Sequence, residues 1–457
     1  MFEVNTAVLL VVSLVGLVAI GVHIAVALGI TSALGIFLVT GADANAFHTV
    51  QAMLADTAYE AIRAYVFAVI PLFMLMGEFI GKSGTVTDVY RGINRLLHKI
   101  PGRLAIATVI GNALFSFVTG VSIASAAAFS RIAYPEMKRH GYHKGFALGA
   151  VAGSSCLGML IPPSVLMIVW GILTEQSIGQ LFAAGVFPGL MLAGLFVLYV
   201  FGWALWDPSA VGSDTRTGDT ATYDGEAADD DGQVSTIQFL ISLLGITVVI
   251  VAVLGGIWFG IFTPTEGAGA GALIGLALGI IKGMRFRDVI DSILSVGKTS
   301  APILLLLVTA ALYSRTLAMT GMANAIESLF LGSGMEPWMV ISVMVLVWFL
   351  LGMIIDSISI MLLTAAIFAP IAAKLGYDPI AFAIIGIMAI EAGLYTPPFG
   401  LLVYTVKAAI HEIEPDMNVM TIFKSATPYW IIMLIAMVII INFPQIAIYL
   451  PSKLFGG

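Results

Sequence analysis

The sequence predicts an all-α integral membrane protein made of two inverted repeats, each with about five transmembrane helices and one re-entrant helical hairpin. Of the 457 residues, 60% are hydrophobic and only 10% are charged, whereas about 25% of a soluble domain is charged. Apolar stretches recur at about the 20-residue length that a membrane-spanning helix needs. An internal repeat and the distribution of Lys and Arg supply the rest of the prediction.

The apolar stretches fall into two halves joined by a polar connector. In the first repeat, residues 1–206, we expect spans at 6–22, 24–41, 60–81 and 181–206, a hairpin at 104–139 and a broken helix at 144–172. In the second repeat, residues 236–457, we expect spans at 236–257, 262–281, 300–319 and 422–443, a hairpin at 337–373 and a broken helix at 379–409. Residues 207–235 are acidic and poor in bulky apolar side chains, which predicts a flexible cytoplasmic linker.

Two basic segments, residues 82–103 and 282–298, interrupt the apolar stretches. Each alternates apolar residues at helical spacing with Arg or Lys. This pattern is typical of a helix that lies in the plane of the membrane interface. We therefore expect two interfacial helices.

An internal repeat relates the two halves. The segment YPEMKRHGYHKGFALGAVAGSSCLGMLIPPS aligns without a gap with APIAAKLGYDPIAFAIIGIMAIEAGLYTPPF. The pair Pro162-Pro163 precedes its counterpart Pro397-Pro398 by 235 positions (397 − 162), and Ser122 precedes Ser357 by the same offset. One register along the whole segment indicates two copies of one unit.

The basic residues predict that the two copies are inverted, because Lys and Arg concentrate in cytoplasmic loops. Arg103 precedes the hairpin 104–139, and Lys138 and Arg139 close it. Both ends of this hairpin are therefore expected in the cytoplasm. The equivalent hairpin is flanked by the segment 332–334 and a lone Lys374, which is consistent with the opposite face.

The matched Pro-Pro pairs mark the candidate site. Proline removes a backbone donor and breaks a helix, which leaves polar backbone groups that are costly in hydrocarbon unless something binds them. Paired breaks in two halves indicate a transport site near the midplane, where half-helix N-termini favour anions and freed carbonyls favour Na⁺. We expect Pro162, Pro163, Ser164, Pro397 and Pro398 to contact the substrate.

Hydroxyl side chains at the hairpin tips extend this candidate site. Ser122, Ser125 and Ser357 lie at the expected tips, where their oxygens can bind a cation or a carboxylate. Small polar residues also pack membrane helices closely, so a packing role stays open for each hydroxyl. For Ser122, Ser357 and Thr396, which lie beside backbone breaks, the ligand interpretation is favoured.

Charged residues inside apolar stretches are expensive and usually functional. The stretches contain Glu78, Arg131, Glu266, Arg315, Asp356 and Glu391. Asp356 and Glu391 are predicted either to couple to Na⁺ or H⁺ or to pair with Arg315, and the two alternatives stay open. Arg131 is expected to pair with an acid or extend to the interface rather than bind substrate.

Cofactor chemistry finds no support in the sequence. The single Cys156 excludes an internal disulfide and a multi-cysteine metal site, and the six histidines show no ligand spacing. A membrane-embedded enzyme or proton-pumping subunit would need paired carboxylates, a histidine cluster or buried lysines. We therefore expect neither an enzyme nor a bound cofactor.

The sequence resembles the large membrane subunit of the tripartite ATP-independent periplasmic (TRAP) transporters, the DctM family. The matching stretches follow the family order and include IPLFMLMGEFIGKSG (70–84), PEMKRHGY (135–142), LFAAGVFPGL (181–190), IFTPTEG (261–267) and EAGLYTPPFGL (391–401). The resemblance implies a multi-pass protein of the inner membrane that imports an organic acid by Na⁺ symport and an elevator movement. It also implies two partners: a small four-helix membrane subunit and a soluble periplasmic or extracytoplasmic substrate-binding protein.

The resemblance suggests Na⁺ ligands at both tips and at the second break: Gly120, Ser122, Asp356, Gly393, Thr396 and Gly400. The first tip departs from the family pattern, since it reads VTGVSIASAAA where the family has an acidic residue after SGxSGSxxA. Na⁺ coordination is therefore assigned more firmly around Gly393, Thr396 and Gly400. The alternative functions are a stand-alone Na⁺- or H⁺-coupled organic anion symporter of the divalent-anion type and a channel, and nothing indicates nucleic-acid binding.

Overall fold

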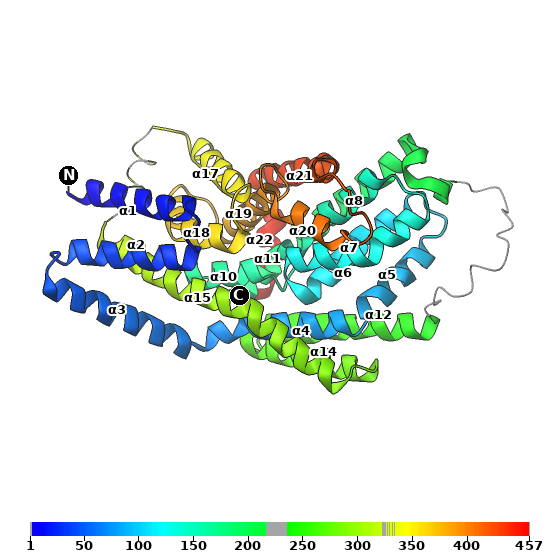
Figure 1. The fold of residues 1–457 in the computed structure, drawn as a ribbon, viewed down its shortest axis with the longest axis horizontal. Coiled ribbons are helices and arrows are strands. Elements are labelled where there is room, and N and C mark those ends of the chain that lie inside the picture. Colours follow the sequence, from blue (N-terminus) through cyan, green and yellow to red (C-terminus); the bar gives the residue numbers. More distant parts are fainter. Residues whose placement is uncertain are drawn as a thin grey trace.

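The computed structural model describes residues 2–215, 235–321, 326, 328, 330, 332 and 334–456, and the described part is helical. Figure 1 shows an elongated bundle with the first hairpin toward one end and the second toward the other. Eight of the described helices are long and apolar enough to span a membrane. The predicted linker lies outside the described residues from 216 to 234, as does Ser333 beside the second hairpin.

The first half follows the predicted order of spans, hairpin and broken helix. Its helices are α1 Phe2–Ala19, α2 Ile24–Val39, α3 Ala44–Arg63, η1 Tyr65–Ala68, α4 Val69–Lys82, α5 Thr85–Leu96, α6 Arg103–Thr119, α7 Ser122–Arg139, α8 Lys144–Ser154, α9 Leu157–Leu160, α10 Val165–Thr174, α11 Ile178–Trp206 and η2 Pro208–Thr215.

The second half repeats this order. Its helices are α12 Thr236–Ile250, η3 Val251–Gly255, α13 Gly256–Trp258, α14 Pro264–Ile281, α15 Phe286–Met319, α17 Pro337–Gly352, α18 Ser357–Lys374, α19 Pro379–Gly393, α20 Leu401–Ala409, α21 Val419–Asn442 and α22 Gln445–Phe455. α6 with α7 and α17 with α18 lie within the ranges expected for the hairpins, and the helices of 144–174 and 379–409 are interrupted at the two Pro-Pro pairs. α7 and α18 even begin and end at positions that differ by 235, from Ser122 to Ser357 and from Arg139 to Lys374.

Side-chain caps explain why helices restart at the breaks. Ser164 accepts a hydrogen bond from the Met167 amide at the start of α10, and Asp356 accepts one from the Ser359 amide at the start of α18. Such caps satisfy amides that a helix N-terminus leaves unpaired. Local sequence therefore sets where α10 and α18 begin.

The structure differs from the prediction in four places. α3 was not expected, because residues 42–59 lack a long apolar run, and α22 was not expected after the last span. The second basic segment is not a separate interfacial helix, since it forms the first turns of the 34-residue α15. The connector begins later than predicted, because Pro208–Thr215 forms a 3-10 turn that buries Val211.

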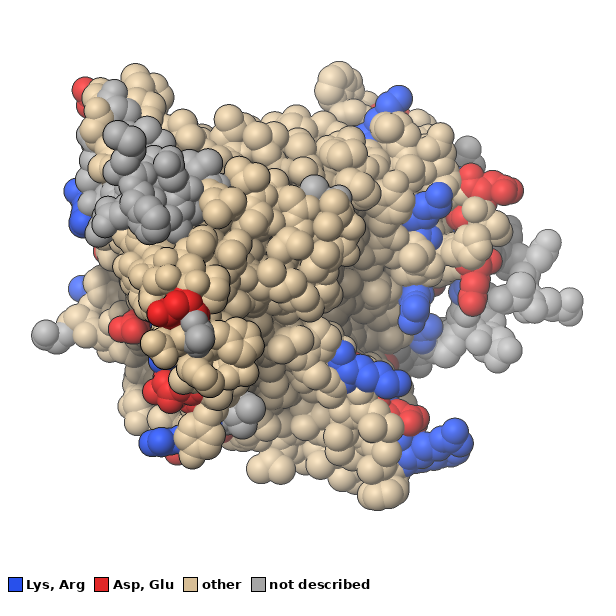
Figure 2. All heavy atoms as spheres, turned by 60° about the vertical axis from the view of Figure 1, so that its left-hand side comes forward, with Lys and Arg blue, Asp and Glu red and all other residues tan. Residues whose placement is uncertain are grey.

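The helices form two groups that meet along the molecule. α1, α2, α3 and α4 pack with α14 and α15 in the first group, and α6 to α11 pack with α17 to α22 in the second. α4 and α15 of the first group contact α6 and α18 of the second. Figure 2 shows a broad uncharged belt between ends that carry the Lys, Arg, Asp and Glu residues. This surface suits a bilayer with charged residues at both interfaces.

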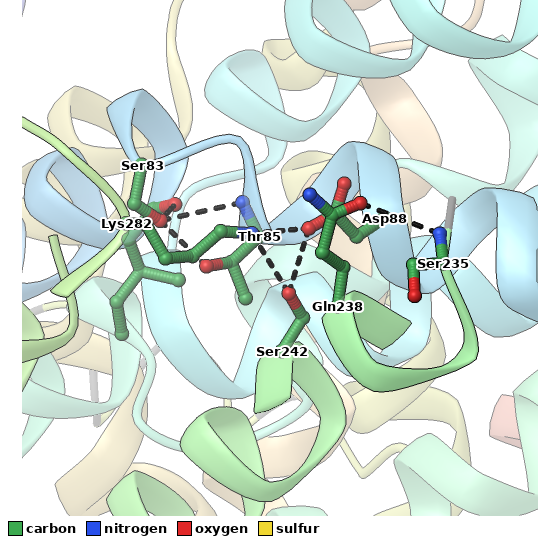
Figure 3. Close-up of polar contacts among 8 residues, drawn as sticks. Ser83, Thr85, Asp88, Ser235, Gln238, Ser242 and Lys282 are labelled. Atoms are coloured by element: carbon green, nitrogen blue, oxygen red, sulfur yellow. Dashed lines mark hydrogen bonds and ion pairs between the residues drawn. The ribbon is translucent and has the colours of Figure 1, made fainter. Parts of the chain in front are cut away.

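The first basic segment does form a helix, α5, which connects α4 to the first hairpin. Its apolar face is buried against α6 and α12. Asp88 of α5 binds the ammonium of Lys282, at the end of α14, and accepts a hydrogen bond of 2.8 Å from Ser242 of α12 (Figure 3). This largely buried ion pair fixes α5 to the first helix group.

Candidate functional site

The two hairpin tips meet on one buried carboxylate. Glu391, on α19, is only 1% exposed. Ser122 donates a hydrogen bond of 2.7 Å to Glu391 Oε2, and Ser357 donates one of 2.8 Å to Oε1. The two serines are the first residues of α7 and α18, so the carboxylate lies at two helix N-termini, where the helix dipoles favour negative charge. It forms no ion pair with any described residue.

Each tip also packs directly against the broken helix of its own half. At the first tip, the Val165 amide donates a hydrogen bond of 3.1 Å to the Gly120 carbonyl. A Cβ atom on Gly120 would lie 2.3 Å from the Pro163 carbonyl oxygen, and φ is +62° there, so only glycine fits. At the second tip, the Phe399 amide donates a hydrogen bond of 3.1 Å to the Met353 carbonyl. The tips and breaks therefore form one continuous packed unit.

A cleft of about 600 Å³ separates this unit from the first helix group. One helix face from each of three helices lines most of it: Met74, Gly77, Glu78, Gly81 and Lys82 of α4; Ile123, Ala124, Ala127, Ala128 and Arg131 of α7; and Ser295, Val296, Thr299 and Ile303 of α15. Thr119 and Val121 of the first tip and Asp356, Ser357 and Ile358 of the second also line it. The cleft thus extends along α7 from the two tips.

The tip closes the cleft at one end. Gly77 of α4 is buried there, and a Cβ atom on it would lie 2.9 Å from the Val118 carbonyl oxygen and 3.0 Å from Thr119 Cα. At the other end Gly81 and Lys82 are exposed. The cleft therefore opens toward the end where the basic segment begins.

The predicted substrate residues fall into two groups in the structure, those that line the cleft and those that do not. Ser357 lines the cleft, whereas Ser122 and Ser125 are buried behind its wall. Pro162, Pro163 and Ser164 are also buried, and the Ser164 hydroxyl is bound to the Met159 carbonyl. Pro397 and Pro398 are exposed but do not line this cleft. The structure therefore brings Ser122 and Ser357 together, and it keeps the two Pro-Pro pairs apart from the cleft.

The predicted Na⁺ residues lie at the tips and at the second break. Ser125 is fully buried, and its hydroxyl has no hydrogen-bond partner among the described residues. Thr396 donates a hydrogen bond of 2.6 Å to the Gly393 carbonyl. Gly393 packs against Gly352 with no room for a side chain, and Gly400 adopts φ +50° at the restart of α20. Asp356 lines the cleft and caps α18.

The structure removes one of the two alternatives for Asp356 and Glu391, which is pairing with Arg315. Arg315 pairs with Glu60 and Asp56 of α3 and therefore not with Asp356 or Glu391. Glu266 lies in the first turn of α14, where it caps the helix together with Thr263.

Arg131 forms no ion pair with a described residue and lines the cleft. Sequence reasoning also missed Ser295 and Thr299, although their four-residue spacing on one helix face was a usable signal.

The arrangement defines a class of protein: a helical membrane transporter with opposed hairpins and broken helices. The family model for the DctM component of the tripartite ATP-independent periplasmic transporters matches residues 11–446. The chain is 32% identical to the C4-dicarboxylate TRAP transporter large permease protein DctM of Pseudomonas aeruginosa, over 88% of this chain and 90% of that one. It is 27% identical to the ectoine TRAP transporter large permease protein TeaC of Halomonas elongata, over 98% of this chain and 99% of that one.

The fold is similar to the crystal structure of the Alcanivorax borkumensis YdaH transporter. The TM-score is 0.62 at 14% identity, over 88% of this chain and 90% of that one. The chain belongs to the DctM family of TRAP transporter large permeases. It is therefore a multi-pass bacterial membrane protein and a transporter permease, not an enzyme, as the sequence predicted.

Proposed function

We propose that this permease imports an organic carboxylate by Na⁺ symport, with the substrate bound in the cleft between the two helix groups. The observation that carries the proposal is the cleft itself, which runs from both hairpin tips along α7, α4 and α15. One wall belongs to each helix group, so a movement of one group past the other changes which end of the cleft is open. This is the geometry that alternating access requires.

The hairpin unit is proposed to move as a body, in an elevator movement between two inverted repeats. Glu391 holds both tips, and each tip is hydrogen-bonded to its broken helix. Gly77 supports a sliding contact, because the absence of a side chain lets the first tip lie directly on the α4 backbone. The Asp88–Lys282 pair keeps α5 with the first group while the hairpin moves.

Na⁺ is proposed to bind at the hairpin tips and the breaks, through Gly120 and Ser122 at the first tip, Asp356 at the second tip, and Gly393, Thr396 and Gly400 at the second break. Na⁺ prefers oxygen ligands, and freed backbone carbonyls at broken helices supply them. The buried Ser125 hydroxyl, which has no partner among the described residues, is a further oxygen available at the first tip. Of the predicted substrate residues, only Ser357 lines the cleft, and it is proposed to contact the substrate there.

The family is tripartite, and we propose that this chain works with a small four-helix membrane subunit and a soluble binding protein that delivers the substrate. Relatives are named for C4-dicarboxylates and for ectoine, so family membership leaves several carboxylate substrates open. The binding protein is proposed to select among them.

The test is uptake by the permease co-reconstituted with its small subunit and binding protein in liposomes. Radiolabelled succinate and ectoine are offered with an inward Na⁺ gradient or with K⁺ in its place, at fixed pH. We expect uptake only with Na⁺ and binding protein. Undiminished uptake in K⁺ would contradict Na⁺ coupling, and equal uptake without binding protein would favour the stand-alone symporter.

A further inference from the structure

We propose that Arg131 binds the anionic group of the substrate in the cleft and so makes this permease selective for carboxylates. The inference rests on the proposed transport function and assigns the recognition step to a residue that the sequence patterns did not single out as a ligand. It follows from the shape of α7, the charges in the cleft and the polar groups on the opposite wall.

The exposed face of α7 leads from the tip to Arg131. Ile123, Ala124, Ala127 and Ala128 line the cleft on the same helix face as Arg131. The three alanines leave open space beside the helix. Arg131 lies nine positions after the first residue of α7, about 13 Å along the axis, and helical side chains point back toward the N-terminus. We therefore infer that its guanidinium reaches along the cleft in the direction of the tips.

Arg131 forms no ion pair with the other charged residues that line the cleft. Four of the lining residues are charged: Glu78, Lys82, Arg131 and Asp356. Lys82 Nζ lies 3.5 Å from Glu78 Oε1, so these two residues form an ion pair. Asp356 accepts hydrogen bonds from the amide and the hydroxyl of Ser359. Within the described part of the chain, Arg131 is thus the one cleft cation without an acidic partner.

An unpaired cation at membrane depth is costly, and such residues usually mark a ligand path. A guanidinium presents two parallel N–H donors that match a carboxylate, with more geometric specificity than an ammonium. A carboxylate ligand therefore offsets the cost of placing Arg131 in the cleft. The same site disfavours a cation or a neutral amide, which leaves the guanidinium unpaired.

The opposite wall adds hydroxyl groups without adding charge, although the Thr299 hydroxyl donates a hydrogen bond of 2.9 Å to the Ser295 carbonyl within α15. Ser295 and Thr299 of α15 line the cleft one helical turn apart. An anion held by Arg131 thus lies between the guanidinium on the hairpin unit and the hydroxyls on the first helix group. It therefore contacts both helix groups, which move relative to each other in the proposed transport cycle. Arg131 has no counterpart in the second repeat, where the equivalent position (131 + 235) is Ala366. The proposed anion-binding arginine therefore occurs in only one repeat, so the ligand has one orientation in the cleft.

The experiment measures ligand-induced thermal stabilisation of the purified permease with its small subunit in nanodiscs containing Na⁺. The probes are acetate, pyruvate, succinate and 2-oxoglutarate, with succinamide as an uncharged control. The variants are Arg131→Gln and Arg131→Lys. Arg315→Gln is the matched control, because Arg315 is paired with α3 and lies outside the cleft lining.

We expect at least one carboxylate, and not succinamide, to stabilise the wild type. Its Kd should rise at least tenfold in Arg131→Gln, by less in Arg131→Lys, and not at all in Arg315→Gln. An unchanged Kd in Arg131→Gln would overturn the role of Arg131 while leaving carboxylate transport intact. A wild type that responds to none of the carboxylates would overturn both proposals. If Arg131→Gln does not fold, the Arg131→Lys titration decides the matter by the same comparison.

Discussion

Replacing Glu391 with alanine removes the acceptor that both hairpin tips share. In the native protein each carboxylate oxygen accepts one hydroxyl, at 2.7 Å from Ser122 and 2.8 Å from Ser357. Each hydrogen bond to a charged group contributes about 1.5–3 kcal/mol. Removing the buried carboxylate also removes its desolvation cost, which offsets part of the loss. We expect a net destabilisation of about 2–4 kcal/mol, or a fall of about 2–4 °C in the apparent Tm.

The Glu391→Gln substitution removes the charge of the side chain and keeps its shape. The amide oxygen accepts one serine hydroxyl as before, and the amide nitrogen donates to the other serine, whose oxygen can accept. The tips stay joined without the charge, so we expect a loss of about 1 kcal/mol. Transport should therefore survive in the glutamine variant far better than in the alanine variant, because the hairpin unit still moves as one body.

The assay is thermal unfolding followed by tryptophan fluorescence, combined with uptake in liposomes. Ser122→Ala and Ser357→Ala should each lower the apparent Tm in the native background. Neither should lower it further in the Glu391→Ala background, because the shared acceptor is already gone. Ser342→Ala is the control, since the Ser342 hydroxyl is bound only within α17, at 2.8 Å from the Trp338 carbonyl. Additive effects of the serine and glutamate changes would refute the joining role of Glu391.

Two further perturbations test the sliding contact and the end of the hairpin unit where Lys138 and Lys144 meet Glu414. Gly77→Ala places a Cβ atom 2.9 Å from the Val118 carbonyl oxygen of the tip, so it should slow uptake severalfold and lower the apparent Tm. Gly81→Ala, with no atom within 4 Å of the added Cβ atom, should do neither, and equal uptake in both variants would contradict the contact. The ammonium groups of Lys138 and Lys144, each within 2.8 Å of a Glu414 carboxylate oxygen, hold the pKa of Glu414, in the loop after α20, below its usual range. Because the folded pKa is lowered, this stabilisation is present above the unfolded pKa of about 4.3 and is lost as pH falls through the folded pKa. Glu414→Gln should therefore lower the apparent Tm at pH 7 and flatten its fall toward acid pH, whereas parallel curves would exclude the contribution.

The arrangement of helices was predictable wherever local sequence decides it. Apolar length gave most spans, and the offset of 235 located both hairpins and both breaks. α3 was missed because its apolar residues occupy one face only, and charge on the other face hides it from a search for apolar length. α15 was divided wrongly for a related reason, since its basic first turns resemble an interfacial helix although no break separates them from the span.

The position of the site was predictable, but its chemistry was not. The chemistry depends on positions at which the two repeats carry different residues. Ser122 and Ser357 are repeat mates, and both reach Glu391, whose own mate (391 − 235) is Cys156. One carboxylate already accepts both serine hydroxyls, and the first repeat carries Cys156 at the equivalent position. No periodicity reveals such a contact, since Ser122 and Glu391 lie 269 positions apart. The exceptions to the repeat therefore include Glu391, which holds the two tips, and Arg131, which we propose binds the ligand.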